Sequence, residues 1–350
     1  VDWTFVHINT DKGIRGLGEL NPSVRRADEL GTLRQMAETL IGRDPRQIEK
    51  LHALFDPASL DRIGFRALSA LDQAFWDILG KSLDAPVHAL LGGACRDEIR
   101  LYANINRATR GDRSPEAFAR NATAAVSDGF DAIKLAPFDG LARGIDKAED
   151  AADGIACMQA VRQAIGPNVD LLIDCHSHFT AKGALAVAKA LADLDLFWFE
   201  EPVPDEDIAG YLEVKAKSGL PIAGGESRMH RRGFWQACND NILDIAMPDV
   251  TIVGGICELK KVAAMAEARG IRTAPHGPFG PVTTASSVHA MAAHPAFTIL
   301  EYAWGEVPWR PTLTLPNEKI SNGRITLPQT PGLGIELDEK IVAAHRIAIT

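Results

Sequence analysis

The sequence lacks the features that would assign it to a membrane, nucleic-acid-binding or secreted class. It contains no run of 18 or more apolar residues, so we expect no membrane span. Its formal net charge of −9 argues against nucleic acid or an anionic membrane as a partner. Its five cysteines are odd in number and form no CxxC pair, which is typical of a reducing, cytoplasmic setting.

A low-complexity linker is also missing, so we expect any lobes of the chain to be tightly joined. The composition, 46% hydrophobic and 24% charged, is that of a globular protein with a large core. A length of 350 residues suits a (β/α)8 barrel with an added lobe. The chain begins with Val1, inside a strand-like run, so we expect a few residues to precede it. Whether a cleaved targeting segment also precedes Val1 stays an open question.

The first region reads as a mixture of strands and helices. Residues 1–20 alternate apolar and polar around Asp11–Gly13, which predicts a β-hairpin. Helical periodicity follows over Arg26–Leu40, Pro45–Phe55 and Phe65–Gly80. We therefore expect an α+β capping domain over residues 1–95.

From about Ile99 the pattern changes to alternating strands and helices. Eight strand-like runs end near Asn106, Lys134, Asp174, Glu200, Glu226, Asp249, His276 and Glu301. Helical segments between them include Ala181–Asp193, Gly255–Arg269 and Thr284–Ala293. Eight such units predict a modified (β/α)8 TIM-like barrel over residues 96–304, with an insertion within Asp139–Gly154. The Pro-rich segment 305–350 is expected to return to the capping domain.

Three acidic residues end three successive strand-like runs at equal steps. Asp174, Glu200 and Glu226 are separated by 200−174 = 26 and 226−200 = 26 residues. In a barrel, active-site residues lie at the carboxyl ends of the strands. Clustered carboxylates repel one another unless a cation binds them, and all-oxygen ligands suit Mg²⁺. A single acid at a strand end is commonly just solvated, but three in series predict a metal site.

The next two strand ends carry Asp249 and His276. An aspartate beside a histidine orients the imidazole and raises its pKa, which produces a general base. His176 follows Asp174 by two residues, so on a continuing strand both side chains would face the same side. His176 could then donate a proton opposite His276. For His276 the plainer alternative is a histidine that merely satisfies a backbone carbonyl, and one of His176 and His178 is expected to be a bystander.

Other residues near the strand ends have weaker assignments. Lys134 could neutralise a substrate carboxylate or simply extend to solvent, and Glu301 could bind a substrate oxygen or pair with Lys134. Glu201 is expected to support the site without ligating, and Cys175 to be buried packing. His176 and His178 together resemble the HxH zinc pair of amidohydrolase barrels, although Glu200 and Glu226 are the wrong residue types for that site.

Taken together, these motifs resemble the enolase superfamily and specifically its mandelate racemase subgroup. The resemblance rests on Asp174, FEEP around Glu200, GGES around Glu226, Asp249 with His276, and Glu301, and on three capping segments, GLGEL, DILGKSLDAPVHALLGG and PGLGIELD. It implies one Mg²⁺ on the three acids, a His276–Asp249 base, Glu301 bonded to a substrate carboxylate oxygen, and a homo-oligomer.

One departure from the subgroup's pattern favours a particular reaction. Lys134-Leu135-Ala136 lacks the second lysine of a Lys-x-Lys, which puts two-base racemisation in doubt. Asp174-Cys175-His176 instead resembles the Asp-x-His of sugar-acid dehydratases, so we expect dehydration of a sugar acid to a 2-keto-3-deoxy acid. A racemase, epimerase or cycloisomerase, a zinc hydrolase and a non-catalytic metal-binding barrel stay open.

The identity of the sugar acid is not encoded in these motifs. We expect it to depend on residues Glu19–Arg26 and on the insertion after the second strand. Four arginines could contact the substrate there: Arg25, Arg26, Arg107 and Arg143.

Overall fold

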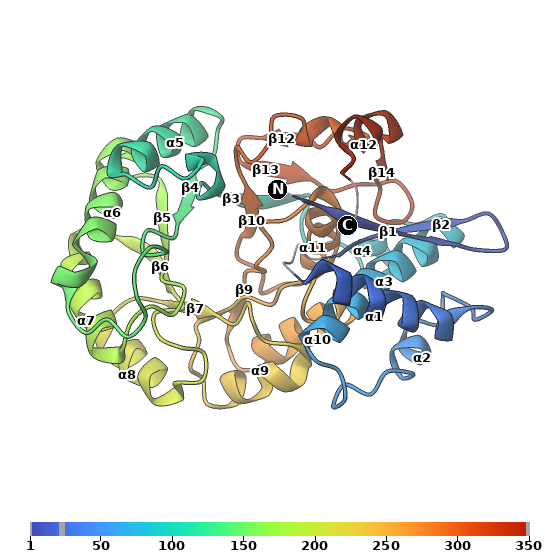
Figure 1. The fold of residues 1–350 in the computed structure, drawn as a ribbon, viewed down its shortest axis with the longest axis horizontal. Coiled ribbons are helices and arrows are strands. Elements are labelled where there is room, and N and C mark those ends of the chain that lie inside the picture. Colours follow the sequence, from blue (N-terminus) through green and yellow to red (C-terminus); the bar gives the residue numbers. More distant parts are fainter. Residues whose placement is uncertain (1, 21–24, 348–350) are drawn as a thin grey trace.

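The computed structural model describes residues 2–20 and 25–347 (Figure 1). The first region is a hairpin packed on helices: β1 (Thr4–Asn9) pairs antiparallel with β2 (Arg15–Leu20). Helices α1 (Arg26–Leu40), α2 (Ile48–His52), α3 (Arg62–Ser82) and α4 (Val87–Leu90) follow. A Cβ at Gly18 would lie 2.0 Å from the Ala70 carbonyl oxygen, so glycine lets β2 lie directly on α3. The predicted α+β character of this region is confirmed.

Eight parallel strands come next, in the predicted order. They are β3 (Glu98–Asn104), β4 (Ala132–Leu135), β5 (Asp170–Asp174), β6 (Leu196–Glu200), β7 (Ile222–Gly224), β8 (Ile245–Ala246), β9 (Arg272–Thr273) and β10 (Leu300–Ala303). Each pairs with the next from β3 to β9, and β10 returns to pair with β3. Between β9 and the segment before β10, the described residues form only one isolated parallel bridge, Thr273–Phe297.

Helices separate the strands and lie outside them, as Figure 1 shows for α5 to α9. Their bounds are α5 (Pro115–Ser127), α6 (Ala152–Ile165), α7 (Ala181–Ala190), α8 (Ile208–Ser218), α9 (His230–Asn239), α10 (Gly255–Glu267) and α11 (Pro281–Ala292). Short 3-10 turns are η1 (Arg107–Thr109), η2 (Ala148–Ala151) and η3 (Ala192–Leu194). The expected insertion Asp139–Gly154 is irregular only up to Lys147, because η2 and α6 begin within it.

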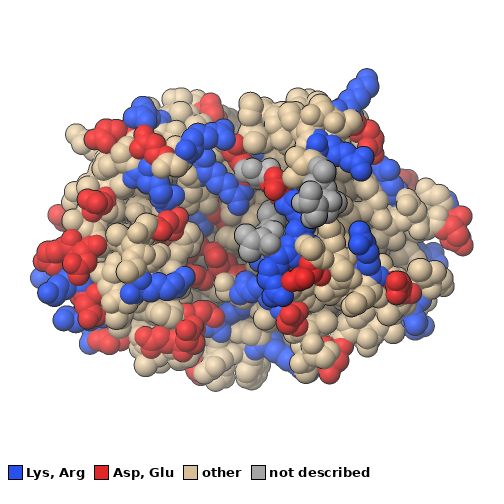
Figure 2. All heavy atoms as spheres, viewed as in Figure 1, with Lys and Arg blue, Asp and Glu red and all other residues tan. Residues whose placement is uncertain are grey.

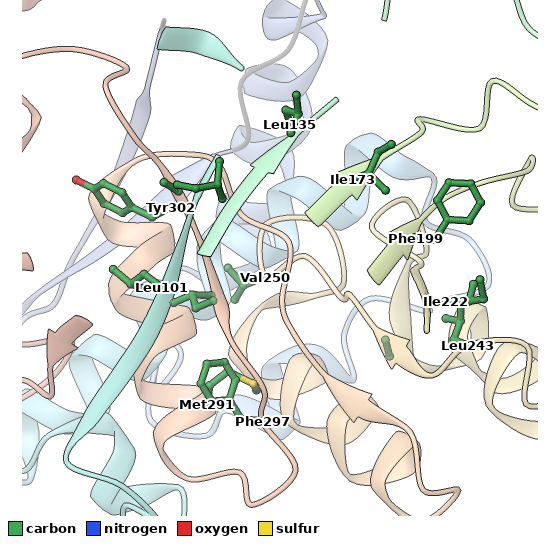
Figure 3. Close-up of a cluster of buried hydrophobic side chains, with 14 of the residues drawn as sticks. Leu101, Leu135, Ile173, Phe199, Ile222, Leu243, Val250, Met291, Phe297 and Tyr302 are labelled. Atoms are coloured by element: carbon green, nitrogen blue, oxygen red, sulfur yellow. The ribbon is translucent and has the colours of Figure 1, made fainter. Parts of the chain in front are cut away.

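Side chains of the strands alternate between two cores. The inward set is Tyr102, Ala132, Leu172, Trp198, Ala223, Ile245, Met247, Ala274 and Ile299. The outward set, which includes Leu101, Ile173 and Phe199, packs with the helices (Figure 3). Rings of Tyr102 on β3 and Trp198 on β6 lie 5.4 Å apart, whereas three strand spacings in a flat sheet span about 14 Å. The sheet is therefore strongly curled around the inward set.

The C-terminal segment contacts both halves of the molecule. It contains η4 (Arg310–Thr312), β11 (Thr314–Leu315), β12 (Ile320–Ser321), β13 (Arg324–Thr326), β14 (Glu336–Leu337) and α12 (Glu339–His345). β13 pairs antiparallel with β3, so this part extends the strand layer rather than the first lobe. Further on, Glu336 pairs with Lys81 at 2.5 Å and Glu339 with Arg15 at 3.1 Å. No helix in the described part of the chain is long and apolar enough to cross a membrane.

Two buried acids of the first lobe join it to the strand–helix region. Glu19 accepts hydrogen bonds from the backbone N–H groups of Gly280, Val282 and Thr283 at 2.6, 3.1 and 3.0 Å, at the start of α11. Asp72 accepts from Cys257 N–H at 3.2 Å, at the start of α10. Both side chains sit where a helix presents unsatisfied N–H groups and positive potential. The expected tight junction is thus built from caps supplied across lobes.

Candidate active site

Three predicted residues occupy the last inward positions of their strands. Lys134 follows Ala132 on β4, Asp174 follows Leu172 on β5, and Glu200 follows Trp198 on β6, each two residues beyond a member of the inward core. This period-two spacing brings their polar groups to the carboxyl end of the sheet. Figure 2 shows a hollow in the middle of the molecule with acidic atoms in its floor.

Three other predicted residues lie beyond the strands, not at their last positions. β7 ends at Gly224, β8 at Ala246 and β9 at Thr273, so Glu226, Asp249 and His276 belong to the loops that follow. The sequence pattern overestimated these strands because the apolar runs continue after the backbone pairing stops. The loops nevertheless return the three side chains to the same end of the sheet.

The predicted acids Asp174, Glu200 and Glu226 converge. Each offers a carboxylate oxygen within 4.8 Å of the others. Burial and the neighbouring charge of Asp174 raise the pKa of Glu200 well above its ordinary value, and burial likewise raises the pKa of Glu226. Glu226 Oε2 is buried without a hydrogen bond, although His276 Nε2 lies 3.2 Å from it. Among the three acids, Glu226 thus keeps a buried oxygen that no protein donor satisfies.

These donors fit a hard divalent cation. Carboxylate oxygens are the ligands Mg²⁺ prefers, and the three acids offer oxygens that lie within 4.8 Å of one another. The buried, unbonded oxygen of Glu226 is the feature a cation would satisfy. We assign Asp174, Glu200 and Glu226 as the residues that would hold it.

Lys134 lies among the acids and not in front of them. Its side chain is 1% exposed, and Nζ is 3.0 Å from Glu200 Oε1, 2.9 Å from Glu301 Oε1 and 3.6 Å from Asp174 Oδ2. Glu301 also accepts from Asn104 Nδ2 at 2.8 Å and from Gly277 N–H at 3.0 Å. Of the two alternatives for Glu301, these contacts favour pairing with Lys134, and Lys134 itself acts as the cluster's counter-ion.

The predicted Asp249–His276 pair is present. His276 Nδ1 lies 2.8 Å from Asp249 Oδ2, while Asp249 Oδ1 accepts from the N–H and hydroxyl of Thr251, both at 2.7 Å. Nε2 of His276 is left facing Glu226 and Glu301, at 3.2 and 3.8 Å. Burial lowers the pKa of His276, but the charges of Glu226, Glu301 and Asp249 outweigh it and raise the pKa to about 10. The imidazole is thus oriented with one nitrogen toward the acids.

His176 reaches the cluster by a different route from the one its spacing suggested. β5 ends at Asp174, and His176 and Ser177 adopt left-handed φ values of 43° and 59°. The turn still places His176 Nε2 2.9 Å from Asp174 Oδ2, and Nδ1 contacts Asp139. The negative charge of Asp174 raises the pKa of His176 to about 12, with Asp139 adding to the effect.

The neighbouring candidates behave largely as expected. His178 is buried with Nδ1 3.2 Å from the Ala142 carbonyl, so it does not converge with His176 as an HxH zinc pair would. Cys175 is fully buried in the outer core. Glu201 is buried, and its Oε2 lies 3.4 Å from the Ser177 hydroxyl. Burial, with Glu226 nearby, raises the pKa of Glu201 to about 8, and its Oε1 is buried without a hydrogen bond.

The candidate substrate arginines occupy separate places. Arg107 pairs with Glu306, and Arg143 donates to the Ser177 carbonyl at 3.3 Å, next to His176. Arg26 pairs with Asp2. Part of the expected substrate loop, residues 21–24, falls outside the described residues. Asp139, which sequence reasoning missed, is the added site residue; its position inside the predicted insertion was the only available signal.

Sequence profiles of two domains match this chain. Residues 2–92 match the profile described as "Mandelate racemase / muconate lactonizing enzyme, N-terminal domain". Residues 117–341 match that described as "Enolase C-terminal domain-like". Both halves of the expected resemblance are therefore confirmed.

Individual relatives match over nearly the whole chain. D-gluconate dehydratase of Thermoproteus tenax is 32% identical, covering 98% of this chain and 69% of its own. D-galactarolactone cycloisomerase of Agrobacterium fabrum is 34% identical, covering 98% and 91%. The crystal structure of a mandelate racemase/muconate lactonizing enzyme from Jannaschia sp. CCS1 superposes with a TM-score of 0.90 at 34% identity, covering 99% and 93%.

Proposed function

Because the chain belongs to the mandelate racemase / muconate lactonizing enzyme family, we propose that it is a hydro-lyase that dehydrates a sugar acid, an aldonate or an aldarate. The reaction removes the proton α to the carboxylate and the hydroxyl on the next carbon. The resulting enol tautomerises to a 2-keto-3-deoxy acid. The D-gluconate dehydratase relative supports this reaction class.

The observation that carries the proposal is a pair of histidines at the edge of one acid cluster. His276 Nε2 lies beside Glu226, and His176 Nε2 lies beside Asp174. β-Elimination of water needs a base for the α-proton and an acid for the departing hydroxyl. Two separately held imidazoles meet that need. Two-base racemisation is disfavoured because Ala136 stands where a second lysine would be, and Lys134 is buried as a counter-ion of Glu200 and Glu301.

The α-proton of a carboxylate is weakly acidic, so charge must be stabilised as it develops. When bound, Mg²⁺ supplies that stabilisation at the substrate carboxylate. Its positive charge also offsets the negative charges of the acids that raise the pKa of His276. His276 Nε2 takes the α-proton while Asp249 holds Nδ1. His176 gives a proton to the β-hydroxyl, the C–O bond breaks and water leaves. Lys134 balances the remaining charge of Glu200 and Glu301.

Cycloisomerisation or epimerisation is the second candidate function, because one relative of this chain is a D-galactarolactone cycloisomerase. The same base would remove the α-proton, and His176 would return a proton to carbon. Incubation in D₂O separates the two. Deuterium incorporation into substrate or its isomer, with no water lost, would exclude the dehydratase.

The direct test is to screen purified protein with Mg²⁺ against mono- and diacid sugars, detecting 2-keto acids with a carbonyl reagent. We expect product from one stereochemical group, and none with His276→Asn. No product from the whole library, with exchange in D₂O retained, would move the assignment to isomerisation. No product and no exchange would support a non-catalytic barrel.

The architecture we propose around this site is a modified (β/α)8 barrel over residues 96–304, closed where Thr273 bridges Phe297. Residues 1–95 and 305–350 would form its cap. The ion pairs of Lys81 with Glu336 and Arg15 with Glu339 support that division. We also propose a homo-oligomer, which light scattering of the purified protein tests.

A further inference from the structure

The loop after β4 supplies an acid that contacts His176. Asp139 Oδ1 bonds His176 Nδ1, and Asp139 Oδ2 lies 2.9 Å from Arg113 Nη2. Arg113 also donates to the Ala136 carbonyl and places its guanidinium carbon 5.3 Å from the centre of the Phe118 ring. A continuous chain of contacts therefore runs from α5 through the loop to the imidazole.

His176 needs such a partner because no strand orients it. Its backbone lies in a left-handed turn, held by Ser177 N–H to the Glu201 carbonyl at 2.8 Å and by His176 N–H to Asp174 Oδ1 at 3.0 Å. These bonds fix the main chain, but the ring can still rotate about its side-chain torsions. With 35% of the side chain exposed, packing alone does not hold the imidazole.

The arrangement repeats that of the other histidine. Asp249 accepts from His276 Nδ1 and leaves Nε2 toward the acids. Asp139 likewise contacts Nδ1 of His176 and leaves Nε2 toward Asp174. A carboxylate on one ring nitrogen sets the tautomer and directs the other nitrogen. An isolated Asp139–Arg113 pair would be an ordinary surface ion pair; its contact with the site imidazole distinguishes it.

We propose that Asp139 is a positioning residue for His176: it holds Nδ1 so that Nε2 faces the departing hydroxyl, and Arg113 holds Asp139. The site would then contain two Asp–His pairs, Asp249–His276 for proton removal and Asp139–His176 for loss of water. The inference rests on the proposed dehydration and adds a residue from the loop after β4 to it.

The first test compares Asp139→Asn with Asp146→Asn, a matched control in the same loop whose carboxylate contacts Thr180 and not a histidine. Elimination is followed as 2-keto acid, and α-proton removal as deuterium exchange in D₂O. For Asp139→Asn we expect kcat for elimination to fall at least about tenfold, with exchange within about twofold of wild type. Asp139→Glu should restore part of the loss, and the control should match wild type. A parallel fall in both reactions, or no fall, would overturn the proposal.

The second test does not depend on turnover. In protein with ¹⁵N-labelled histidine and saturating Mg²⁺, the signals of His176 are assigned by their loss in His176→Asn. We expect Asp139→Asn, but not Asp146→Asn, to shift the His176 Nδ1 signal and change its tautomer distribution. Unchanged signals would refute the positioning role even if dehydration is confirmed. Shifted signals in a protein that dehydrates no sugar acid would retain the Asp139–His176 contact and reject only the proposed reaction.

Discussion

Buried carboxylates occur in two regions of this molecule, and their partners differ. At the lobe junction, Glu19 and Asp72 are fully buried and accept hydrogen bonds from backbone N–H groups at the starts of α11 and α10. At the mouth of the sheet, Asp174, Glu200 and Glu226 face one another, and one oxygen of Glu226 has no hydrogen bond. Burial alone therefore does not identify a metal site. A buried oxygen without a hydrogen bond also occurs at Glu29, Glu201 and Glu306, so the mouth acids are distinguished by the convergence of three carboxylates.

A second group near the junction sharpens this contrast. His52, Asp72 and Cys257 also offer ligand atoms within 4.8 Å of one another. Here, however, Asp72 Oδ1 lies 2.7 Å from His52 Nε2 and Oδ2 accepts from Cys257 N–H. Both oxygens of the carboxylate are satisfied by the protein, so the junction acids join lobes while the mouth acids are available to a cation.

The largest effect should follow from losing the mouth acids' cation. Chelation of Mg²⁺, or Glu226→Gln, is expected to reduce dehydration at least about 10⁴-fold, because the developing enediolate loses its stabilising charge. Thermal stability of metal-free Glu226→Gln should not fall, since a repelling charge is removed. Product assays with and without EDTA, together with thermal unfolding, measure both. Full activity without metal would show that the mouth acids serve only structure.

Removing the base should come next in size. His276→Asn is expected to lower the rate of α-proton exchange by about 10³- to 10⁴-fold, because proton transfer by a positioned side chain contributes about 10²- to 10⁴-fold. Asp249 then has no imidazole to orient, which adds to the loss. Mg²⁺ affinity, measured by calorimetry, should remain because all three ligands are retained. Exchange at the wild-type rate would mean that another group is the base.

At the junction we expect the opposite profile, with stability lost and metal binding kept. Glu19→Ala leaves the N–H groups of Gly280, Val282 and Thr283 without their acceptor, which should cost about 2–4 kcal/mol of unfolding free energy. Urea unfolding measures the loss, and calorimetry should show unchanged Mg²⁺ affinity. Glu38→Ala, a matched change at an exposed position, should leave both the unfolding free energy and the Mg²⁺ affinity unchanged. Weakened Mg²⁺ binding in Glu19→Ala would erase the distinction between the two regions.

The smallest effect concerns pH. Burial raises the pKa of Glu19 to about 7, although N–H groups of Thr283 and Gly280 oppose the shift. The folded state therefore retains a proton that the unfolded state releases above about pH 4.5. Relative to Glu19→Gln, wild-type stability should fall as pH rises from about 4.5 to 7, by up to about 3 kcal/mol. The unfolding free energies of both proteins across that pH range measure this effect. If their difference does not change with pH, Glu19 is ionised in the folded state as well as in the unfolded state.

Much of the fold and the site could be predicted because both follow local patterns. Alternation along β4, β5 and β6 places Lys134, Asp174 and Glu200 at inward positions, and the helix bounds Arg26–Leu40 agree with α1. Strand ends at β7, β8 and β9 were misjudged because pairing stops before the apolar run does. The route of β13 to β3 was not anticipated, since pairing between residues more than 200 positions apart has no local signal.

The sequence by itself determined the eight-strand order, the three acids and the Asp249–His276 pair, because periodicity and residue type are local properties that a parallel sheet converts into a shared edge. Only the tertiary structure decided the partners of the other charged groups. It placed Lys134 among the acids, turned His176 through a left-handed bend toward Asp139, and assigned Glu19 to a helix start. Those outcomes depend on donors supplied by distant segments, and a carboxylate's role is set by the partners that folding brings to it.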